Sequence, residues 1–199
     1  MAIKWDRQAA AITQRDIKKA EAAVGHELPL EYTRFMLRQN GGYPSPSIFE
    51  IHGMPKNKYG SAECIYSIRA HNDYDDLLET NANVAQYIPQ YSIAIGHTLS
   101  GDKILLFVDG PREGQVWFYD WYGKSRNPER RIYFIAETFL AFLNSLRELS
   151  PAEEADIEAS IAAMDAARPK PKTSTSGPRP LKRRASRTSA SKRNRRHTK

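Results

Sequence analysis

Cysteine is almost absent from this 199-residue chain, in which Cys64 stands alone. A single thiol excludes an intramolecular disulfide and any metal site that needs several cysteines. Cys64 is followed by the apolar residues Ile65, Tyr66 and Ile68, and such surroundings are typical of a buried thiol. We therefore expect Cys64 to pack in the core rather than to act as a nucleophile.

Long apolar runs are also missing. No stretch approaches the length of about eighteen residues that a membrane-spanning helix requires. The N-terminal segment contains Lys4, Asp6 and Arg7 and no apolar run, which argues against a signal peptide. These absences predict a soluble, cytoplasmic protein with no membrane partner.

Acidic residues are missing from one end of the chain. Residues 168–199 contain thirteen Lys and Arg and no Asp or Glu. The other 17 of the 30 basic residues accompany all 23 acidic ones, so residues 1–167 carry a net charge of about −6 and the end segment about +13. We expect an acidic folded part with a separate basic appendage.

The basic appendage has little to bury. Leu181 is its only large apolar residue, and burying it cannot offset the entropy lost on ordering the backbone, roughly 1–2 kcal/mol per residue. We therefore predict that residues 168–199 form a disordered tail. Its two basic clusters are made by Lys182, Arg183, Arg184, Lys192, Arg193, Arg195 and Arg196.

Several interpretations of these clusters stay open. They suit salt-dependent contacts with nucleic-acid phosphates, a nuclear localisation signal, or a segment that only keeps the protein soluble. The tail has no aromatic residue, which argues against stacking on bases. Its charge also allows it to fold back over the acidic part until a partner displaces it.

Two short helices are expected near the N-terminus. The first begins at a capping box of Thr13 and Asp16 and ends at Gly25. The second begins at Pro29 and ends at Asn40-Gly41-Gly42, because glycine adopts the left-handed conformation without a steric cost. Their short connection predicts a helical hairpin packed against a sheet.

The remaining chain shows both strand and helix patterns. Apolar and β-branched stretches predict strands over 47–51, 64–68, 91–95, 104–108, 115–121 and 131–135. Apolar periodicity and capping signals predict helices over 72–86, 137–149 and 150–167. Asn72 or Asp73 is the expected N-cap of the first of these, and Ser150 with Glu153 forms a capping box for the last.

Several of these segments together resemble the SUKH superfamily. The segments are Leu28-Pro29, Tyr32, Phe35 and Asn40-Gly41-Gly42, then 93–95, 101–106 and 114–120, then Phe139, Phe142 and Leu143. The family often has a histidine after the aspartate that ends its hairpin, whereas Trp121 follows Asp120 here. The resemblance runs from about Thr13 to Leu149 and leaves the basic tail outside.

The resemblance implies an α+β domain with an antiparallel sheet of about five to six strands and helices packed on it. With the N-terminal helical hairpin and the disordered C-terminal tail, this predicts three regions. They are a SUKH-like domain over 1–149, a C-terminal helix over 150–167 and the basic tail over 168–199.

The resemblance also implies binding rather than a reaction, because the superfamily includes bacterial toxin-immunity proteins and fungal regulators of cell-wall synthesis. We expect a non-enzymatic protein-binding module that neutralises a toxin, for example a nuclease, without a cofactor or small-molecule substrate. The alternative is a regulatory scaffold or adaptor whose basic tail binds nucleic acid or directs localisation. A small hydrolase is a more distant alternative.

The residues offer few candidates for chemistry. The five histidines are scattered, and the acids around Asp73 lack the glycine and terminal glutamate of a calcium loop. Those acids either lie at the solvent-exposed N-terminus of a helix or form a patch that attracts a basic partner electrostatically. The candidate partner-binding residues are Asp73, Asp75, Asp76, Glu79, Asp102, Asp109 and Glu113, and Glu63 is a further acid of this kind. No catalytic or metal-binding residue is expected.

Overall fold

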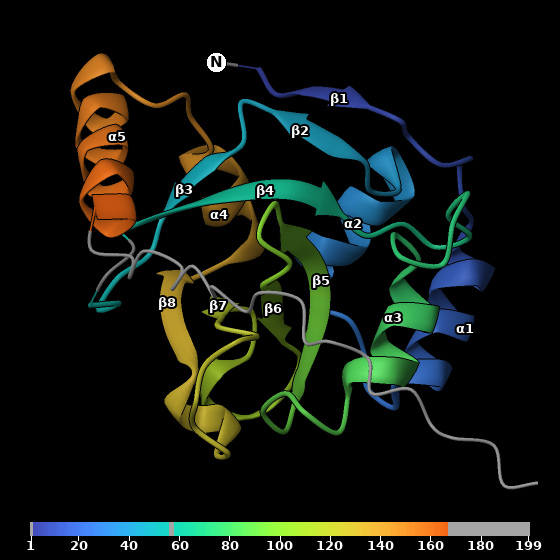
Figure 1. The fold of residues 1–199 in the computed structure, drawn as a ribbon. Helices are drawn as coiled ribbons and strands as arrows, with labels where there is room; N and C mark the ends of the chain where they lie inside the picture. Colours follow the sequence, from blue (N-terminus) through green and yellow to red (C-terminus); the bar gives the residue numbers. More distant parts are fainter. Residues whose placement is uncertain (1, 56–57, 167–199) are drawn as a thin grey trace, which may run out of the picture. The chain divides into compact units, whose positions relative to one another are not determined.

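The structure is a computed structural model that describes residues 2–55 and 58–166. The strands are β1 (Lys4–Asp6), β2 (Tyr43–Ser45), β3 (Ile48–Glu50), β4 (Tyr59–Ile65), β5 (Ser92–Thr98), β6 (Lys103–Phe107), β7 (Val116–Tyr119) and β8 (Ile132–Ala136). The α-helices are α1 (Gln14–Val24), α2 (Leu30–Gln39), α3 (Leu77–Val84), α4 (Phe139–Ser145) and α5 (Pro151–Ala166). Two 3₁₀ turns, η1 (Gly110–Arg112) and η2 (Pro128–Arg130), complete the set (Figure 1).

The main sheet confirms the predicted α+β fold. Its six strands are antiparallel and follow the order β3-β4-β5-β6-β7-β8, so each strand lies beside its neighbours in sequence. The first and last strands also approach each other, because the His52 N–H donates to the Phe134 carbonyl at 2.9 Å. A second sheet pairs β1 with β2 and was not predicted, since three residues with a proline in the partner strand give no recognisable pattern.

Both predicted N-terminal helices are present, and each packs beside a later helix. The Thr13 N–H and hydroxyl both donate to Asp16, and Gly25 ends α1 with a φ of 79°. α1 lies beside α3, and α2 lies beside α4 (Figure 1). In the second pair, the Phe139 ring is 4.9 Å from Tyr32, and both rings are almost fully buried. Such aromatic packing holds α2 and α4 together.

The end of α2 is joined to the segment after β4 by a buried asparagine. Asn40 has a φ of 49° and ends the helix. Its amide donates to the Ala10 and Ile68 carbonyls at 2.7 and 3.0 Å, and its oxygen accepts from the Ile68 N–H at 2.9 Å. A Cβ on Gly41 would lie 2.6 Å from the carbonyl oxygens of Ile65 and Tyr66, so only glycine fits there. The predicted helix stop is therefore also a tertiary joint.

The largest errors in the predicted boundaries concern α3, β4 and α4. α3 begins at Leu77 with Asp76 as its cap, not at Asn72 or Asp73, because the chain from 66 to 76 folds as a loop. β4 covers 59–65 instead of 64–68. α4 ends at Ser145, well before 149, because Arg147 exchanges two backbone hydrogen bonds of 3.0 Å with Ile48 and so leaves the helix.

The C-terminal part begins as predicted. Glu153 accepts from the Ser150 N–H at 2.8 Å, which confirms this capping box, and it also pairs with Arg147 at 2.6 Å. The compact unit runs to Glu154, and the rest of α5 belongs to a second unit. The regions proposed as 1–149, 150–167 and 168–199 stay a prediction, and the tail lies outside the described residues. No helix in the described ranges has the length and apolarity needed to cross a membrane.

Candidate functional site

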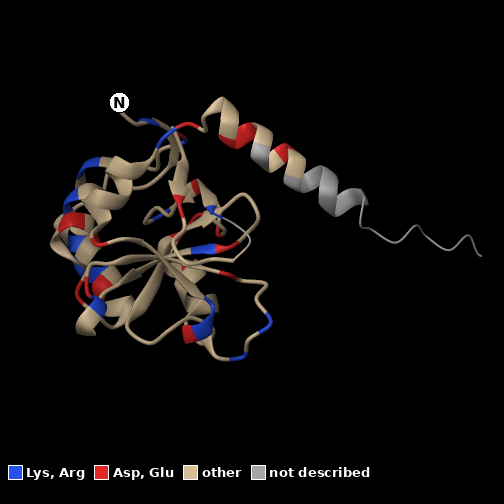
Figure 2. Cartoon of the chain, turned by 90° about the vertical axis from the view of Figure 1, so that its left-hand side faces the viewer, with Lys and Arg blue, Asp and Glu red and all other residues tan. Residues whose placement is uncertain are grey.

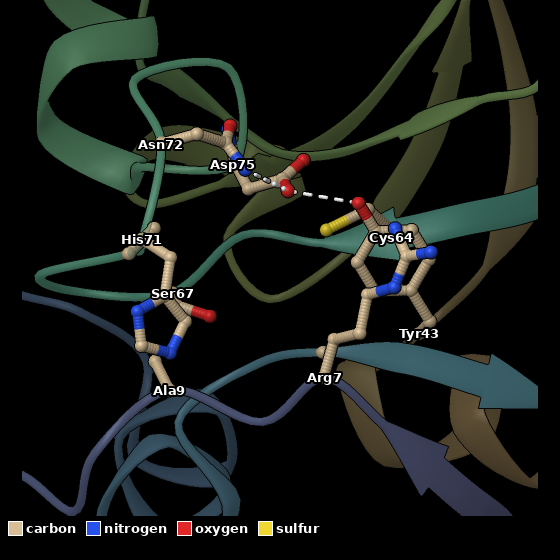
Figure 3. Close-up of a pocket in the computed structure, with 10 residues that line it drawn as sticks. Arg7, Ala9, Tyr43, Cys64, Ser67, His71, Asn72 and Asp75 are labelled. Carbon is tan, nitrogen blue, oxygen red and sulfur yellow. Dashed lines mark hydrogen bonds between the residues drawn. The ribbon is translucent and has the colours of Figure 1, made fainter.

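A pocket of about 310 Å³ lies between β2, the end of β4 and the loop that follows β4 (Figure 3). Asp75 is at its wall and is 9% exposed. One carboxylate oxygen of Asp75 accepts hydrogen bonds from the Tyr43 hydroxyl and the Asn72 amide, each at 2.8 Å. The Arg7 guanidinium lies over the Tyr43 ring at 5.0 Å. The pocket therefore has a buried carboxylate that is held in place by two donors.

The groups around Asp75 keep their ordinary charges at neutral pH. Burial alone would raise the pKa of Asp75, but the donors Asn72 and Tyr43 outweigh it and hold the pKa below its usual value. Burial and the Asp75 carboxylate raise the pKa of Tyr43 to about 12. Burial also raises the pKa of the Cys64 thiol, which is 1% exposed. The predicted packed thiol is confirmed, and the pocket contains no activated nucleophile.

A second pocket of about 440 Å³ shares Asp75 and extends toward β5 and β6. His97 and Lys103 line it. Burial lowers the pKa of both side chains, and Lys103 adds to the effect on His97. Within residues 2–55 and 58–166, no three His, Cys, Asp or Glu side chains gather as metal ligands would. Asp75, which both pockets share, is the centre of a hydrogen-bond network with Tyr43 and Asn72.

Three of the candidate partner-binding acids make hydrogen bonds within the fold. Asp75 is engaged as described, and Asp76 caps α3 by accepting from the Leu78 N–H at 2.8 Å. Asp102 is 8% exposed and accepts from the Ser100 hydroxyl at 2.6 Å and the Trp121 N–H at 2.9 Å. Their carboxylates accept hydrogen bonds within the protein, and a role of these three residues in binding a partner stays a prediction.

The other four candidates, Asp73, Glu79, Asp109 and Glu113, are exposed, but they do not form one patch. Asp73 and Glu79 lie in and near α3. Asp109 and Glu113 lie in the β6–β7 connection and line a groove of about 580 Å³. We call this the acidic groove. Its lining residues are Gln14, Lys18, Glu21, His26, Glu27, Leu28, Pro29, Leu30, Thr33, Val108, Asp109 and Glu113.

The acidic groove brings together carboxylates from distant parts of the chain. Glu21 from α1 and Glu27 from the α1–α2 connection join Asp109 and Glu113, which gives four carboxylates against one lysine. That lysine, Lys18, is 2.7 Å from Glu21 and neutralises it. Sequence reasoning missed Glu21 and Glu27 because only the fold places the end of α1 beside the β6–β7 connection.

The groove also exposes apolar surface. Leu30, at the start of α2, is 62% exposed. Tyr91 is 41% exposed, and its ring packs edge-on against His26 at 5.7 Å. On the side shown in Figure 2, blue and red residues are mixed along the helices at the left, whereas α5 carries acidic residues without basic ones. The acidic groove combines carboxylates from separate segments with exposed apolar surface.

The comparison with protein families agrees with this fold. The sequence matches the SMI1 / KNR4 family (SUKH-1) over residues 11–145, which is more than half of the chain. The chain belongs to the SUKH-1 family. The match begins just before α1 and ends at the last residue of α4. It includes the acidic groove and the second pocket, and it includes the lining of the first pocket except Arg7 and Ala9. No curated protein matches the chain closely enough to add a relative of known role.

The motif residues that signal SUKH-1 membership are structural in this chain. Asn40 and Gly41 join α2 to the segment after β4, and Phe139 packs α4 on α2. Trp121 stands where the family often has histidine, and its backbone N–H donates to the Asp102 carboxylate. The Lys103 Nζ lies over the Trp121 ring, 5.6 Å from the ring centroid. The basic clusters of the tail lie outside the described residues, so their role stays a prediction.

Proposed function

We propose that this SUKH-1 protein is a non-enzymatic protein-binding module that neutralises a toxin by binding it through the acidic groove. The observation that carries the proposal is the convergence of Glu27, Asp109 and Glu113 around the exposed Leu30. Family membership supports a binding role, and the groove supplies a surface with the chemistry for it.

The groove suits a partner with a basic surface and an apolar anchor. An exposed leucine among carboxylates can fill a small apolar pocket, while the acids at the rim attract Lys and Arg of the partner. Charges of this kind act mainly on the rate of association, because they guide the encounter over a Debye length of about 10 Å at 0.1 M salt. A nuclease toxin, which presents basic groups to phosphates, has the required charge.

The polar cluster around Asp75 supports the absence of catalysis. A general base or nucleophile needs a pKa moved toward neutrality or a partner that removes its proton. Here the pKa values of Asp75, Tyr43 and Cys64 all move away from neutrality, whereas burial lowers the pKa of Lys103 toward it in the neighbouring pocket. Asp75 and Tyr43 therefore hold the loop in place rather than transfer protons.

The test is capture of the partner with the full-length chain from its native host, followed by mass spectrometry and binding kinetics. The variant Asp109→Asn with Glu113→Gln should lower the association rate constant about tenfold at low salt and much less at high salt. The matched control removes two exposed acids away from the groove, Asp73→Asn with Glu79→Gln, and should leave the rate unchanged.

The identity of the partner discriminates between the alternatives. Capture of a toxin whose activity the protein suppresses would support the proposal. A partner without toxic activity would favour a regulatory scaffold, and equal association rates for both double variants would remove the acidic groove as the binding surface.

A further inference from the structure

The loop between β7 and β8, residues 120–131, is basic although the folded part of the chain is acidic. It contains Lys124, Arg126, Arg130 and Arg131 against two acids, Asp120 and Glu129. Lys and Arg recur along the segment that leads into η2 (Figure 2). This feature is independent of the acidic groove and is not used by the proposed function.

The loop has a defined backbone. The Asp120 N–H donates to the Arg131 carbonyl at 2.9 Å, and the Arg131 Nε returns a hydrogen bond to the Asp120 carbonyl at 2.8 Å. The Asn127 side chain accepts from the Glu129 N–H at 3.0 Å and so caps η2. These bonds fix the two ends of the loop, so its side chains project from a constrained frame.

The side chains at the tip of the loop are exposed and carry unneutralised positive charge. Lys124, Arg126 and Arg130 are exposed, and among the described residues no carboxylate lies within ion-pair distance of them. Glu129 does not offset them, because it pairs with Arg112 at 2.8 Å. Tyr122 is 72% exposed and lies next to these cations in the loop.

Cations and aromatic rings also alternate where the loop meets the sheet. Lys103 lies 5.6 Å from the Trp121 ring, and Arg131 lies 4.5 Å from the Tyr119 ring. Arg112 contacts the Trp117 ring at 5.3 Å. The Arg131 guanidinium also donates to the Asp120 and Trp121 carbonyls, and Arg112 pairs with Glu129, so these cations brace the base of the loop while the outward positive charge comes from Lys124, Arg126 and Arg130.

We propose that loop 120–131 binds single-stranded nucleic acid, with Tyr122 stacking on a base and Lys124, Arg126 and Arg130 contacting phosphates. Phosphate and base alternate along a single strand, as cation and ring alternate here, and stacking on a tyrosine accepts any base. A duplex fits less well, because its bases are stacked on one another and the loop offers no helix to enter a groove. The tail has no aromatic residue, so the loop supplies an aromatic ring for base stacking that the tail cannot provide.

The test measures binding of a fluorescein-labelled oligo(dT) of about fifteen nucleotides to the full-length chain by fluorescence anisotropy. Tyr122→Ala should weaken binding about tenfold, and Tyr122→Phe, which keeps the ring, should restore it. The triple variant of Lys124, Arg126 and Arg130 to alanine should reduce the slope of log affinity against log salt by about 2, because each phosphate contact to a single strand contributes about 0.7.

The matched control replaces three exposed cations of α1 and α2, Arg15, Lys19 and Arg34, by alanine, and it keeps the same tail. This variant should retain the wild-type slope and affinity. Equal effects of the two triple variants, or no loss with Tyr122→Ala, would overturn the proposal and leave binding to the tail alone. Tighter binding of a matched duplex, or full displacement of the oligonucleotide by a polyglutamate peptide, would also overturn it, in favour of a general anion surface.

Discussion

Replacing Asn40 by glycine tests whether the joint between α2 and the segment after β4 stabilises the fold. Glycine keeps the left-handed backbone at φ 49° without strain, so the substitution removes the side-chain hydrogen bonds and little else. The lost partners are the Ile68 N–H and carbonyl, which are buried, and the Ala10 carbonyl, which is near the surface.

The magnitude follows from the burial of those groups. A buried polar group left without a partner costs about 1–3 kcal/mol, whereas the Ala10 carbonyl can accept a hydrogen bond from water instead. The two groups of Ile68 therefore predict a loss of about 2–6 kcal/mol in the free energy of unfolding. Asn40→Ala should lose about 1 kcal/mol more than Asn40→Gly, because alanine must also adopt the left-handed conformation.

Urea denaturation of the full-length chain measures these losses, and the m-value checks that unfolding stays two-state. The control is Asn83→Ala, which removes an exposed side-chain hydrogen bond to the Glu79 carbonyl and should change stability by no more than about 0.5 kcal/mol. If Asn40→Gly costs no more than the control, the joint does not stabilise the fold and the reasoning is wrong.

Three further predictions concern the same region. Gly41→Ala should destabilise the protein far more than Gly25→Ala in thermal melts, because its Cβ would overlap backbone oxygens whereas nothing lies within 4 Å of a Cβ at Gly25. Because the pKa of Asp75 is lowered in the folded protein, its carboxylate stabilises the fold at pH values above its usual pKa of about 4, and this stability is lost as the pH falls through the lowered value. Asp75→Asn should therefore reduce the loss of stability at acid pH in a plot of unfolding free energy against pH. An unchanged loss would contradict this. The Cys64 thiol should react with Ellman's reagent only as fast as the protein unfolds, and rapid labelling of the native protein would show that it is accessible.

Much of the fold could be predicted from local patterns. The capping boxes at Thr13 and Ser150, the stop at Asn40 and the central strands all depend on residues close together in sequence. The errors arose where distant residues compete for the backbone. α4 stops early because Arg147 pairs with Ile48, about one hundred positions away, and no local signal reports that pairing.

The candidate site was less predictable. Charge patterning selected Asp109 and Glu113, which line the acidic groove, and it also selected Asp75 and Asp102, which are buried and hydrogen-bonded. Sequence shows that a residue is acidic, not whether a neighbouring donor occupies its carboxylate. Glu21 could be added to the groove only after the fold had placed α1 beside the β6–β7 connection.

The approach of β3 to β8 has a consequence for solubility. Sheets with two open outer strands can recruit another chain through unsatisfied backbone groups, which is a common start of aggregation. In this protein the segment after β3 uses its His52 N–H on Phe134 of β8, and Ile48 is paired with Arg147. These isolated bridges give both outer strands of the six-stranded sheet backbone partners within the domain, which leaves fewer unsatisfied groups there for another chain to pair with.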